Sequence, residues 1–359
     1  MIQDMTLTRV QSNRVHALPF AVMALVILAG FALAGCATVD STGIALAAHQ
    51  EAIAREVGPL ETAATRQGGP LVAEYLSNAD ALEPEYRFPG TRVLGMVDCE
   101  SCRLGCVLLL GPASPPRGTI VALHGYNAYS AFNLSALYRL AENGWAVVAV
   151  DLPGHGNSSG TRGYIGDFSE YADSVRDIVR WIGDQKAYDL PRPLVLLGHS
   201  TGGAAALETL WDHPEGIDRA VLVAPLIEPR HFTLTSTIAR VSSAFSPYGP
   251  IPGAKQGYLC FDRMPFEWVK ALARWRSGLK MRPAIDIPIL VVQGDADRSV
   301  DCNANLRAIS AIAPKAEVQV LTGRGHVLLD RSDAQEETLA AVESFLDDGI
   351  RLSRTAKSP

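Results

Sequence analysis

The chain has 359 residues and is 48% hydrophobic, which is enough to bury a sizeable core in one large domain or in a domain with an insertion. Its formal net charge is -6 and no basic cluster stands out, so nucleic acid is not an expected partner. Aromatic residues make up only 7% of the chain and no internal repeat is visible, which argues against a solenoid or a propeller.

Residues 1–35 have the pattern of a targeting signal. Two arginines precede an apolar stretch that runs from Ala17 to Ala34 and is followed by Gly35-Cys36. The small residues at this point suit the narrow cleft of a signal peptidase, so the sequence predicts a signal peptide. The alternative is an uncleaved anchor, because the uncharged run continues to Val39 and is long enough to span a bilayer. Both alternatives place the domain outside the cytoplasm.

The tetrad Leu33-Ala34-Gly35-Cys36 resembles the bacterial lipobox, in which a peptidase cleaves before a cysteine that carries acyl chains such as palmitate. The resemblance implies that Cys36 is lipidated and that the protein is a lipoprotein anchored in the bacterial cell envelope. Ala37, rather than an aspartate, follows the cysteine. By analogy this implies the outer membrane, with the domain facing the periplasm or the cell surface.

Residues 36–90 carry alanine- and glutamate-rich patches interrupted by Gly68-Gly69-Pro70 and Pro84. This composition predicts a short helical extension, or a tether, between the membrane and a catalytic domain. The domain itself is expected over residues 91–350, followed by a tail at 351–359.

Five further cysteines follow Cys36, and an oxidising compartment would allow disulfides among them. Their odd number leaves at least one thiol outside any internal pair, and the pairing stays open. These residues are Cys99, Cys102, Cys106, Cys260 and Cys302. No histidine lies near the first three to complete a tetrahedral site, so neither a metal nor another cofactor is expected.

From residue 91 onward, short apolar runs alternate with amphipathic segments. A hairpin is expected at 93–97 and 104–110, and buried strands at 119–123, 146–150, 193–197, 220–223, 289–293 and 318–321. Helices are expected at 134–143, 168–186, from 202 onward, and at 303–313 and 334–346. This alternation predicts an α/β fold in which a mostly parallel sheet has helices on both faces.

Residues 225–287 break the alternation and are read as an inserted cap. Prolines and glycines punctuate this segment, and aromatic residues are dense in it: Phe245, Tyr248, Phe261, Phe266, Trp268 and Trp275. Such a cap would line an apolar pocket, which suits an acyl chain better than a charged metabolite.

The segment Gly198-His199-Ser200-Thr201-Gly202 lies between a predicted strand and a predicted helix. A G-x-S-x-G motif in this context is typical of the nucleophile elbow of the α/β-hydrolase fold. The glycines allow a sharp turn and a close approach of helix and sheet. Ser200 is therefore the candidate nucleophile.

A serine hydroxyl needs a base held by an acid, and in this fold the order along the chain is serine, acid, histidine. Asp295 and Asp297 both follow the strand at 289–293, and Asp297 has the greater reach toward a histidine, whereas Asp295 suits a turn. His326 follows the last strand and is expected at the same sheet edge as Ser200. The predicted acid and base are Asp297 and His326.

The oxyanion hole needs two backbone N–H groups. The residue after the nucleophile, Thr201, is expected to supply one, and Tyr126, in the loop after the strand at 119–123, the other. His124 is expected to hold that loop through hydrogen bonds. His199 is expected to point away from the nucleophile.

Taken together, the chain from Val93 to Leu346 resembles the α/β-hydrolase family, and within it the monoacylglycerol lipase and lysophospholipase-like branch. The motifs that carry the resemblance are His124-Gly125, Asp151-x-x-Gly154-His155-Gly156-x-Ser158, Arg162-Gly163-Tyr164, Gly198-His199-Ser200-Thr201-Gly202-Gly203, Gly294-x-x-Asp297 and Gly325-His326. Tyr129 stands in a region where the branch often has a histidine.

The resemblance implies a serine hydrolase that cleaves carboxylic esters of small lipids through an acyl-enzyme. The nucleophile, acid and base would be Ser200, Asp297 and His326. An aminopeptidase or a thioesterase could use the same triad, and a lipoprotein that only binds ligands is the non-enzymatic alternative. Epoxide hydrolase and dehalogenase chemistry needs a carboxylate nucleophile, which Ser200 does not provide. The oligomeric state, the acyl-chain length and the head group stay open.

Overall fold

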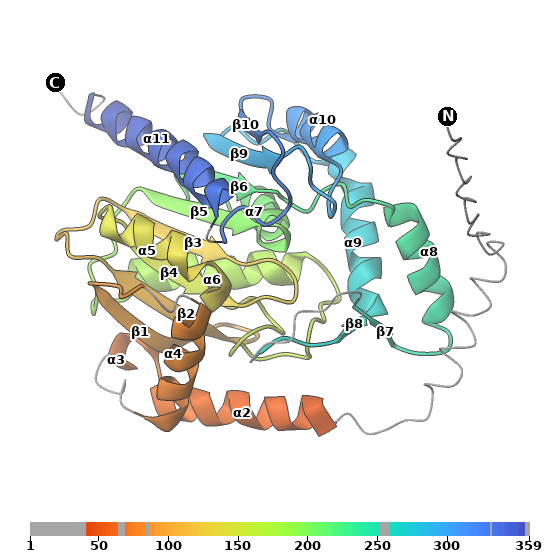
Figure 1. Ribbon diagram of the computed structural model, residues 1–359, viewed down its shortest axis with the longest axis horizontal. Helices are drawn as coiled ribbons and strands as arrows, with labels where there is room; N and C mark the ends of the chain where they lie inside the picture. The colour runs from red at the N-terminus through yellow and green to blue at the C-terminus, as the bar shows by residue number, and fades with distance from the viewer. Residues whose placement is uncertain (1–40, 64–68, 83–85, 252–258, 331, 356–359) are drawn as a thin grey trace, which may run out of the picture.

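The computed structural model describes residues 41–63, 69–82, 86–251, 259–330 and 332–355 (Figure 1). The predicted signal peptide and Cys36 lie outside these residues. An eight-stranded sheet forms the centre, with strand order β1-β2-β4-β3-β5-β6-β9-β10. Its strands are β1 (Thr91–Asp98), β2 (Arg103–Leu110), β3 (Thr119–Leu123), β4 (Ala146–Val150), β5 (Leu194–His199), β6 (Arg219–Val223), β9 (Ile289–Gly294) and β10 (Glu317–Leu321).

The strands β1 and β2 are antiparallel to their neighbours, and the other six strands of this sheet are mutually parallel. Parallel neighbours require crossover connections, which most of the helices supply. The helices are α2 (Ser41–Val57), α3 (Leu60–Ala63), α4 (Pro70–Leu82), α5 (Leu134–Glu142), α6 (Ser169–Asp184), α7 (Thr201–Asp212), α8 (Phe232–Ser242), α9 (Phe266–Gly278), α10 (Cys302–Ile312) and α11 (Asp333–Thr355). The predicted fold class, including the starting hairpin, is confirmed.

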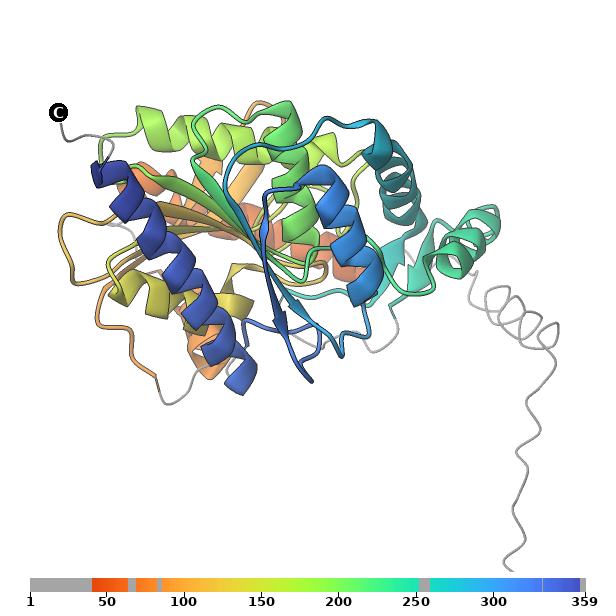
Figure 2. The same cartoon turned by 90° about the horizontal axis from the view of Figure 1, so that it is seen from above.

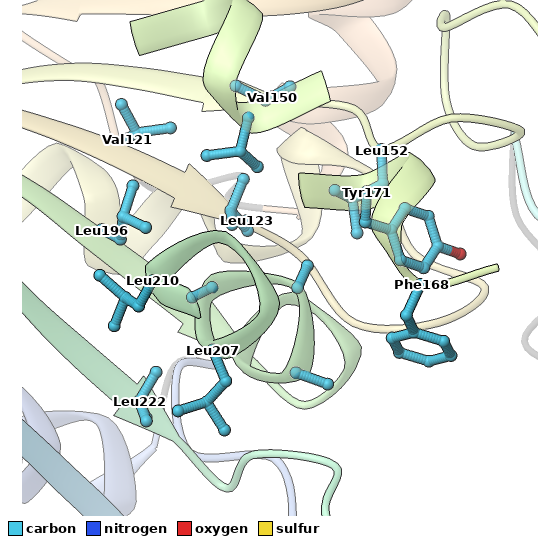
Figure 3. Packing of buried hydrophobic residues seen from close by; sticks show 14 of the residues in the cluster. Val121, Leu123, Val150, Leu152, Phe168, Tyr171, Leu196, Leu207, Leu210 and Leu222 are labelled. Carbon is cyan, nitrogen blue, oxygen red and sulfur yellow. The ribbon is translucent and has the colours of Figure 1, made fainter. Parts of the chain in front are cut away.

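Each central strand sends alternate side chains to opposite faces of the sheet, because successive residues of a strand point in opposite directions. On β3, Val121 and Leu123 join the cluster that contains α6 and α7. Figure 3 shows this packing, with Leu196 and Leu207 among its members. Ile120 joins the second cluster, on the α5 and α11 side. Both faces are thus covered by helices, as Figure 2 also shows.

The segment at residues 36–90 was expected to be an extension or a tether. Within its described part, α2, α3 and α4 pack beside β1 and the hairpin edge (Figure 1). Ile53, Val57 and Tyr75 are buried in the same cluster as the strand residues of that face. These helices therefore share the core of the sheet domain.

The segment between β6 and β9 contains the helices α8 and α9 and a two-stranded antiparallel sheet, β7 (Tyr248–Pro250) and β8 (Arg263–Pro265). Residues 252–258 lie outside the described part. Helix α9 buries Trp268 and Trp275 against the core, whereas α8 lies on its outer side (Figure 2). The sequence indicated an insertion here but not these elements.

At the carboxyl end, α11 continues to Thr355, past residue 350 where the sequence analysis ended the domain. The apolar periodicity that marks a helix stops earlier than the helix does. Among the described residues, no helix is both long enough and apolar enough to cross a bilayer.

Candidate active site

Ser200 occupies the tip of a sharp turn between β5 and α7. Its backbone has φ 52° and ψ -112°, a conformation that residues other than glycine rarely adopt. The turn is held because the Ser200 N–H donates to the Val223 carbonyl at 2.9 Å and the Gly203 N–H donates to the Ser200 carbonyl at 2.9 Å. Strain that is fixed by surrounding contacts in this way is typical of functional positions.

The glycines of the motif are required by close backbone contacts. A Cβ atom added at Gly198 would lie 2.3 Å from the Gly202 carbonyl oxygen. One added at Gly202 would lie 2.2 Å from the Leu123 carbonyl oxygen. Helix α7 therefore crosses directly over β3 and β5, and only glycine permits this approach.

His326 lies in the loop after β10 and bridges the predicted nucleophile and acid. Its Nε2 lies 2.9 Å from Ser200 Oγ, and its Nδ1 lies 2.7 Å from Asp297 Oδ2. The structure thus brings together the three side chains that the sequence singled out. His199 Nε2 lies 3.1 Å from the His326 carbonyl oxygen, so His199 contacts the backbone of the histidine loop.

The Asp297 carboxylate is buried and accepts hydrogen bonds on both oxygens. The N–H groups of Ser299 and Val300 donate to Oδ1 at 2.7 Å and 3.0 Å, and His326 contacts Oδ2. Burial alone would raise the pKa of Asp297, but these hydrogen bonds and the charge of His326 outweigh it and lower the pKa. The carboxyl group is therefore held as an anion beside the imidazole.

Asp295, the competing carboxylate, has a different role. Its Oδ1 accepts a hydrogen bond from the Gly323 N–H at 2.6 Å, and its side chain is exposed. It joins the turn after β9 to the loop that carries His326.

The two predicted oxyanion donors lie on either side of Ser200. Thr201 is the first residue of α7, where a backbone N–H has no acceptor inside the helix. The loop that contains Tyr126 passes close to the nucleophile, since a Cβ atom at Gly125 would lie 3.3 Å from Ser200 Cβ. The oxyanion role of both residues stays a prediction.

His124 fixes this loop, as the sequence analysis expected. The Leu152 N–H donates to His124 Nε2 at 2.9 Å, so the proton is on Nδ1, which lies 2.7 Å from the Gly125 carbonyl oxygen. Burial lowers the pKa of His124, which favours this neutral imidazole.

An aromatic cluster lies next to the predicted oxyanion loop. The Tyr126 ring is 4.1 Å from that of Trp268 and 5.5 Å from that of Phe261, and both partners belong to the cap segment. The Tyr126 hydroxyl donates to the Gly163 carbonyl at 3.0 Å. Aromatic side chains of the cap segment therefore pack against the predicted oxyanion loop.

Two residues of this site were missed by the sequence analysis. Gln293, at the end of β9, donates from Nε2 to Asp297 Oδ2 at 3.0 Å, and Asn305 of α10 contacts Gln293 in turn. The sequence offered one signal for Gln293: it is a lone amide side chain that follows the apolar residues Ile289 to Val292 of a predicted strand. No sequence pattern marks Asn305, because it is one polar residue of α10 and reaches the site only through the packing of that helix.

Among the described residues, the cysteines and other candidate metal ligands form no comparable centre. Within the part of the chain that the structure describes, no group of three or more histidine, cysteine or acidic side chains could hold a metal ion. Cys99, Cys102, Cys106 and Cys302 are free thiols there.

Comparison with known proteins shows which enzymes the chain is similar to. A family model described as serine aminopeptidase, S33, matches residues 114–263. A monoacylglycerol lipase of Mycolicibacterium smegmatis is 25% identical over 255 residues, covering 66% of this chain and 90% of the relative. The human monoglyceride lipase is 29% identical over 245 residues, covering 60% and 78%. A probable lysophospholipase L2 of Haemophilus influenzae is 25% identical over 276 residues, covering 67% and 87%.

Solved structures agree on the fold. A soluble variant of the monoglyceride lipase from Saccharomyces cerevisiae, in complex with a substrate analog, aligns with a TM-score of 0.62 at 18% identity, covering 74% of this chain and 98% of that one. A monoacylglycerol lipase from Paleococcus ferrophilus aligns with a TM-score of 0.57 at 21% identity, covering 68% and 98%.

The sheet order, the elbow and these matches define an α/β hydrolase. Within that class the chain is similar to enzymes named monoacylglycerol lipase, and these matches support a serine ester hydrolase.

Proposed function

We propose that Ser200, His326 and Asp297 form a catalytic triad that hydrolyses carboxylic esters through an acyl-enzyme. The observation that carries the proposal is the continuous chain of contacts from Ser200 Oγ through both imidazole nitrogens to Asp297 Oδ2, at 2.9 Å and 2.7 Å. Hydrogen-bond contacts between nucleophile, base and orienting acid are the geometry that activates a serine.

In the first half of the reaction, Ser200 Oγ attacks the ester carbonyl carbon while His326 Nε2 takes the hydroxyl proton. The carbonyl oxygen becomes an oxyanion, for which the N–H groups of Thr201 and Tyr126 are the proposed donors. Collapse of this intermediate expels the alcohol, which receives the proton from His326.

In the second half, His326 accepts a proton from water, and the resulting hydroxide attacks the acyl-enzyme. The acid product leaves, and Ser200 regains its proton from His326. Asp297 stabilises the imidazolium in both halves, and its lowered pKa keeps it ionised for that role.

The proposed substrates are esters with one acyl chain, of the monoacylglycerol or lysophospholipid kind. Relatives named monoacylglycerol lipase and lysophospholipase support this class. The aromatic side chains that the cap packs against the Tyr126 loop would give an acyl chain apolar surroundings. The outer face of α8 and the turn after it add exposed apolar side chains that suit a lipid: Leu234, Ile238, Val241 and Phe245.

The first prediction concerns the nucleophile. Ser200→Ala should reduce kcat on a monoacylglycerol by at least about 10,000-fold, because the triad acts as a unit. The measurement is fatty-acid release across monoacylglycerols, lysophospholipids and short p-nitrophenyl esters, with the variant as the control. Turnover of all esters by the variant at the wild-type rate would refute the proposal.

Amide hydrolysis is the second candidate function, because the matched family model is described as serine aminopeptidase, S33. The same triad geometry could act on an amide or a thioester. Adding an aminoacyl amide and an acyl thioester to the screen decides this point: a kcat/KM for either well above that for esters would replace the ester assignment.

A lipid anchor at Cys36 is a separate proposal, and it rests on the sequence pattern Leu33-Ala34-Gly35-Cys36. It would hold the enzyme at the outer membrane of a bacterial envelope, close to its lipid substrates. Labelling of growing cells with a fatty-acid probe should mark the wild-type protein and not Cys36→Ala. A wild-type protein that stays unlabelled but membrane-bound would support the uncleaved anchor instead.

A further inference from the structure

A buried amide lies beside the proposed catalytic acid. Gln293 directly precedes Gly294, the last residue of β9. It is the only polar side chain of this strand, and it is fully buried. Its Nε2 donates to Asp297 Oδ2 at 3.0 Å, the same oxygen that contacts His326 Nδ1. An uncharged donor thus shares the oxygen on which the proposed triad depends.

This contact completes the coordination of the carboxylate. Ser299 and Val300 donate backbone N–H groups to Oδ1, and Gln293 and His326 contact Oδ2. Hydrogen bonds from several donors favour the charged form of a carboxyl group and fix its plane. Of the three donors other than His326, Gln293 alone is a side chain and can be removed by substitution.

Asn305 determines which end of the Gln293 amide faces Asp297. Asn305 Nδ2 donates to Gln293 Oε1 at 3.1 Å and to the Pro225 carbonyl at 2.7 Å. Asn305 Oδ1 accepts from the Glu228 N–H at 2.8 Å. Because the oxygen of Gln293 is engaged by Asn305, its nitrogen is directed at the carboxylate. A reversed amide would place two oxygens against each other.

The same contacts join the acid loop to the start of the cap segment. Pro225 and Glu228 precede α8, and both bond to Asn305. Arg230, two residues before α8 begins, donates from Nε to the Asp297 carbonyl at 2.9 Å. The orientation of the carboxylate is therefore tied to the backbone from which the cap begins.

We propose that Gln293 and Asn305 are positioning residues, which hold the Asp297 carboxylate in the plane that His326 requires. The inference rests on the proposed triad and adds two residues to it. Gln293 acts on the carboxylate directly, and Asn305 acts through Gln293.

The test is the pH–rate profile of Gln293→Met, which keeps the volume and removes the donor. We expect kcat on a soluble short ester to fall about tenfold, the effect of one hydrogen bond to a charged group, with KM unchanged. The acid limb of the profile should move to higher pH. The physical reason is that a carboxylate with one donor fewer attracts the protonated imidazole more strongly.

Asn305→Leu is the second variant, and it should move the acid limb in the same direction by a smaller amount, because Gln293 is then free to reverse. Thr338→Val is the matched control: it also removes a buried side-chain hydrogen bond, from Thr338 Oγ1 to the Ala334 carbonyl, on α11. It should leave the profile unchanged.

Active sites are counted with a fluorophosphonate probe, so that loss of folded enzyme is separated from loss of rate. A profile of unchanged shape per active site in both Gln293→Met and Asn305→Leu would overturn the inference, even if both variants are less stable. That result would leave the proposed triad intact as long as Ser200→Ala stays inactive. Activity that persists in Ser200→Ala would instead remove the triad itself.

Discussion

At the scale of single residues, two carboxylates two positions apart have different partners. Asp297 is buried with its oxygens directed at His326 and at two backbone N–H groups, whereas the exposed Asp295 bonds to Gly323. The difference arises from the turn after β9, which directs one side chain inward and the other toward the neighbouring loop. The segment from Gly294 to Asp297 therefore contains the proposed catalytic acid, Asp297, and a second acid, Asp295, that bonds to the neighbouring loop.

This difference predicts opposite outcomes for the same substitution. Asp297→Asn should lower kcat by roughly 10,000-fold, the loss expected when the acid no longer stabilises the imidazolium. Asp295→Asn retains an oxygen that can accept from Gly323, so its kcat should stay within about twofold of the wild type. The measurement is the kcat of both variants in steady-state kinetics on a soluble ester. Equal losses in both variants would contradict the assignment of Asp297.

Some residues of the site could be predicted from the sequence, and others could not. Ser200, Asp297 and His326 each follow a predicted strand, so strand order alone was enough to place them at one sheet edge. Gln293 reads as the end of an apolar strand, and Asn305 as one polar residue of an amphipathic helix. Their role depends on how α10 packs beside β9, which no local pattern encodes.

At the scale of elements, the crossing of α7 over β3 and β5 is the contact that sets the elbow. Gly202 allows α7 to touch the Leu123 carbonyl, and this contact joins the nucleophile turn to the strand that leads into the oxyanion loop. The elbow and that loop therefore form one packed unit.

Gly202→Ala should destabilise the fold strongly, by more than about 3 kcal/mol, because the added methyl group meets a backbone oxygen that cannot move alone. Gly183→Ala is the matched control: Gly183 lies in α6, is exposed and has open space around its Cβ position. Alanine there should raise stability by roughly 0.5–1 kcal/mol. Urea unfolding measures both, and a Gly202→Ala protein as stable as the wild type would contradict the close crossing.

The elements themselves were predictable where burial is uniform. The strands β3, β4, β5, β6 and β9 are short, buried apolar runs, and each lies within two residues of its expected bounds. The expected bounds of β10 are equally close, although most of that strand is exposed. The cap was harder, because α8 exposes its apolar face and β7 and β8 are only three residues long. Packing of α2 and α4 against the sheet was hidden for a different reason, since their alanine-rich composition also suits a solvated tether.

At the scale of the whole molecule, stability should depend on pH through two buried histidines. His124 and His155 are both buried, and burial lowers the pKa of each. Their rings lie 5.2 Å apart, and the neighbouring His124 lowers the pKa of His155 further. In the unfolded chain both would titrate near their usual pKa of about 6.5.

Proton linkage determines whether the stability of the fold rises or falls with pH. Below about pH 6.5 the unfolded chain binds protons that the folded chain excludes, so stability falls as the pH falls, by up to about 1.4 kcal/mol per pH unit for each histidine. Urea unfolding between pH 8 and pH 5 tests this. His155→Gln should reduce the slope by about half, whereas the exposed His231→Asn, whose backbone is left-handed, should not change it. Equal slopes in His155→Gln and the wild type would contradict the expectation.

In the proposed mechanism, the hydroxyl of Ser200 is the group that becomes acylated. The direct measurement is peptide mass spectrometry of the enzyme after reaction with a fluorophosphonate or after a rapid quench with a slow ester. We expect one adduct per chain, located on Ser200, absent in Ser200→Ala and formed far more slowly in His326→Ala. An adduct on any other residue, or full labelling of the Ser200→Ala protein, would contradict the account.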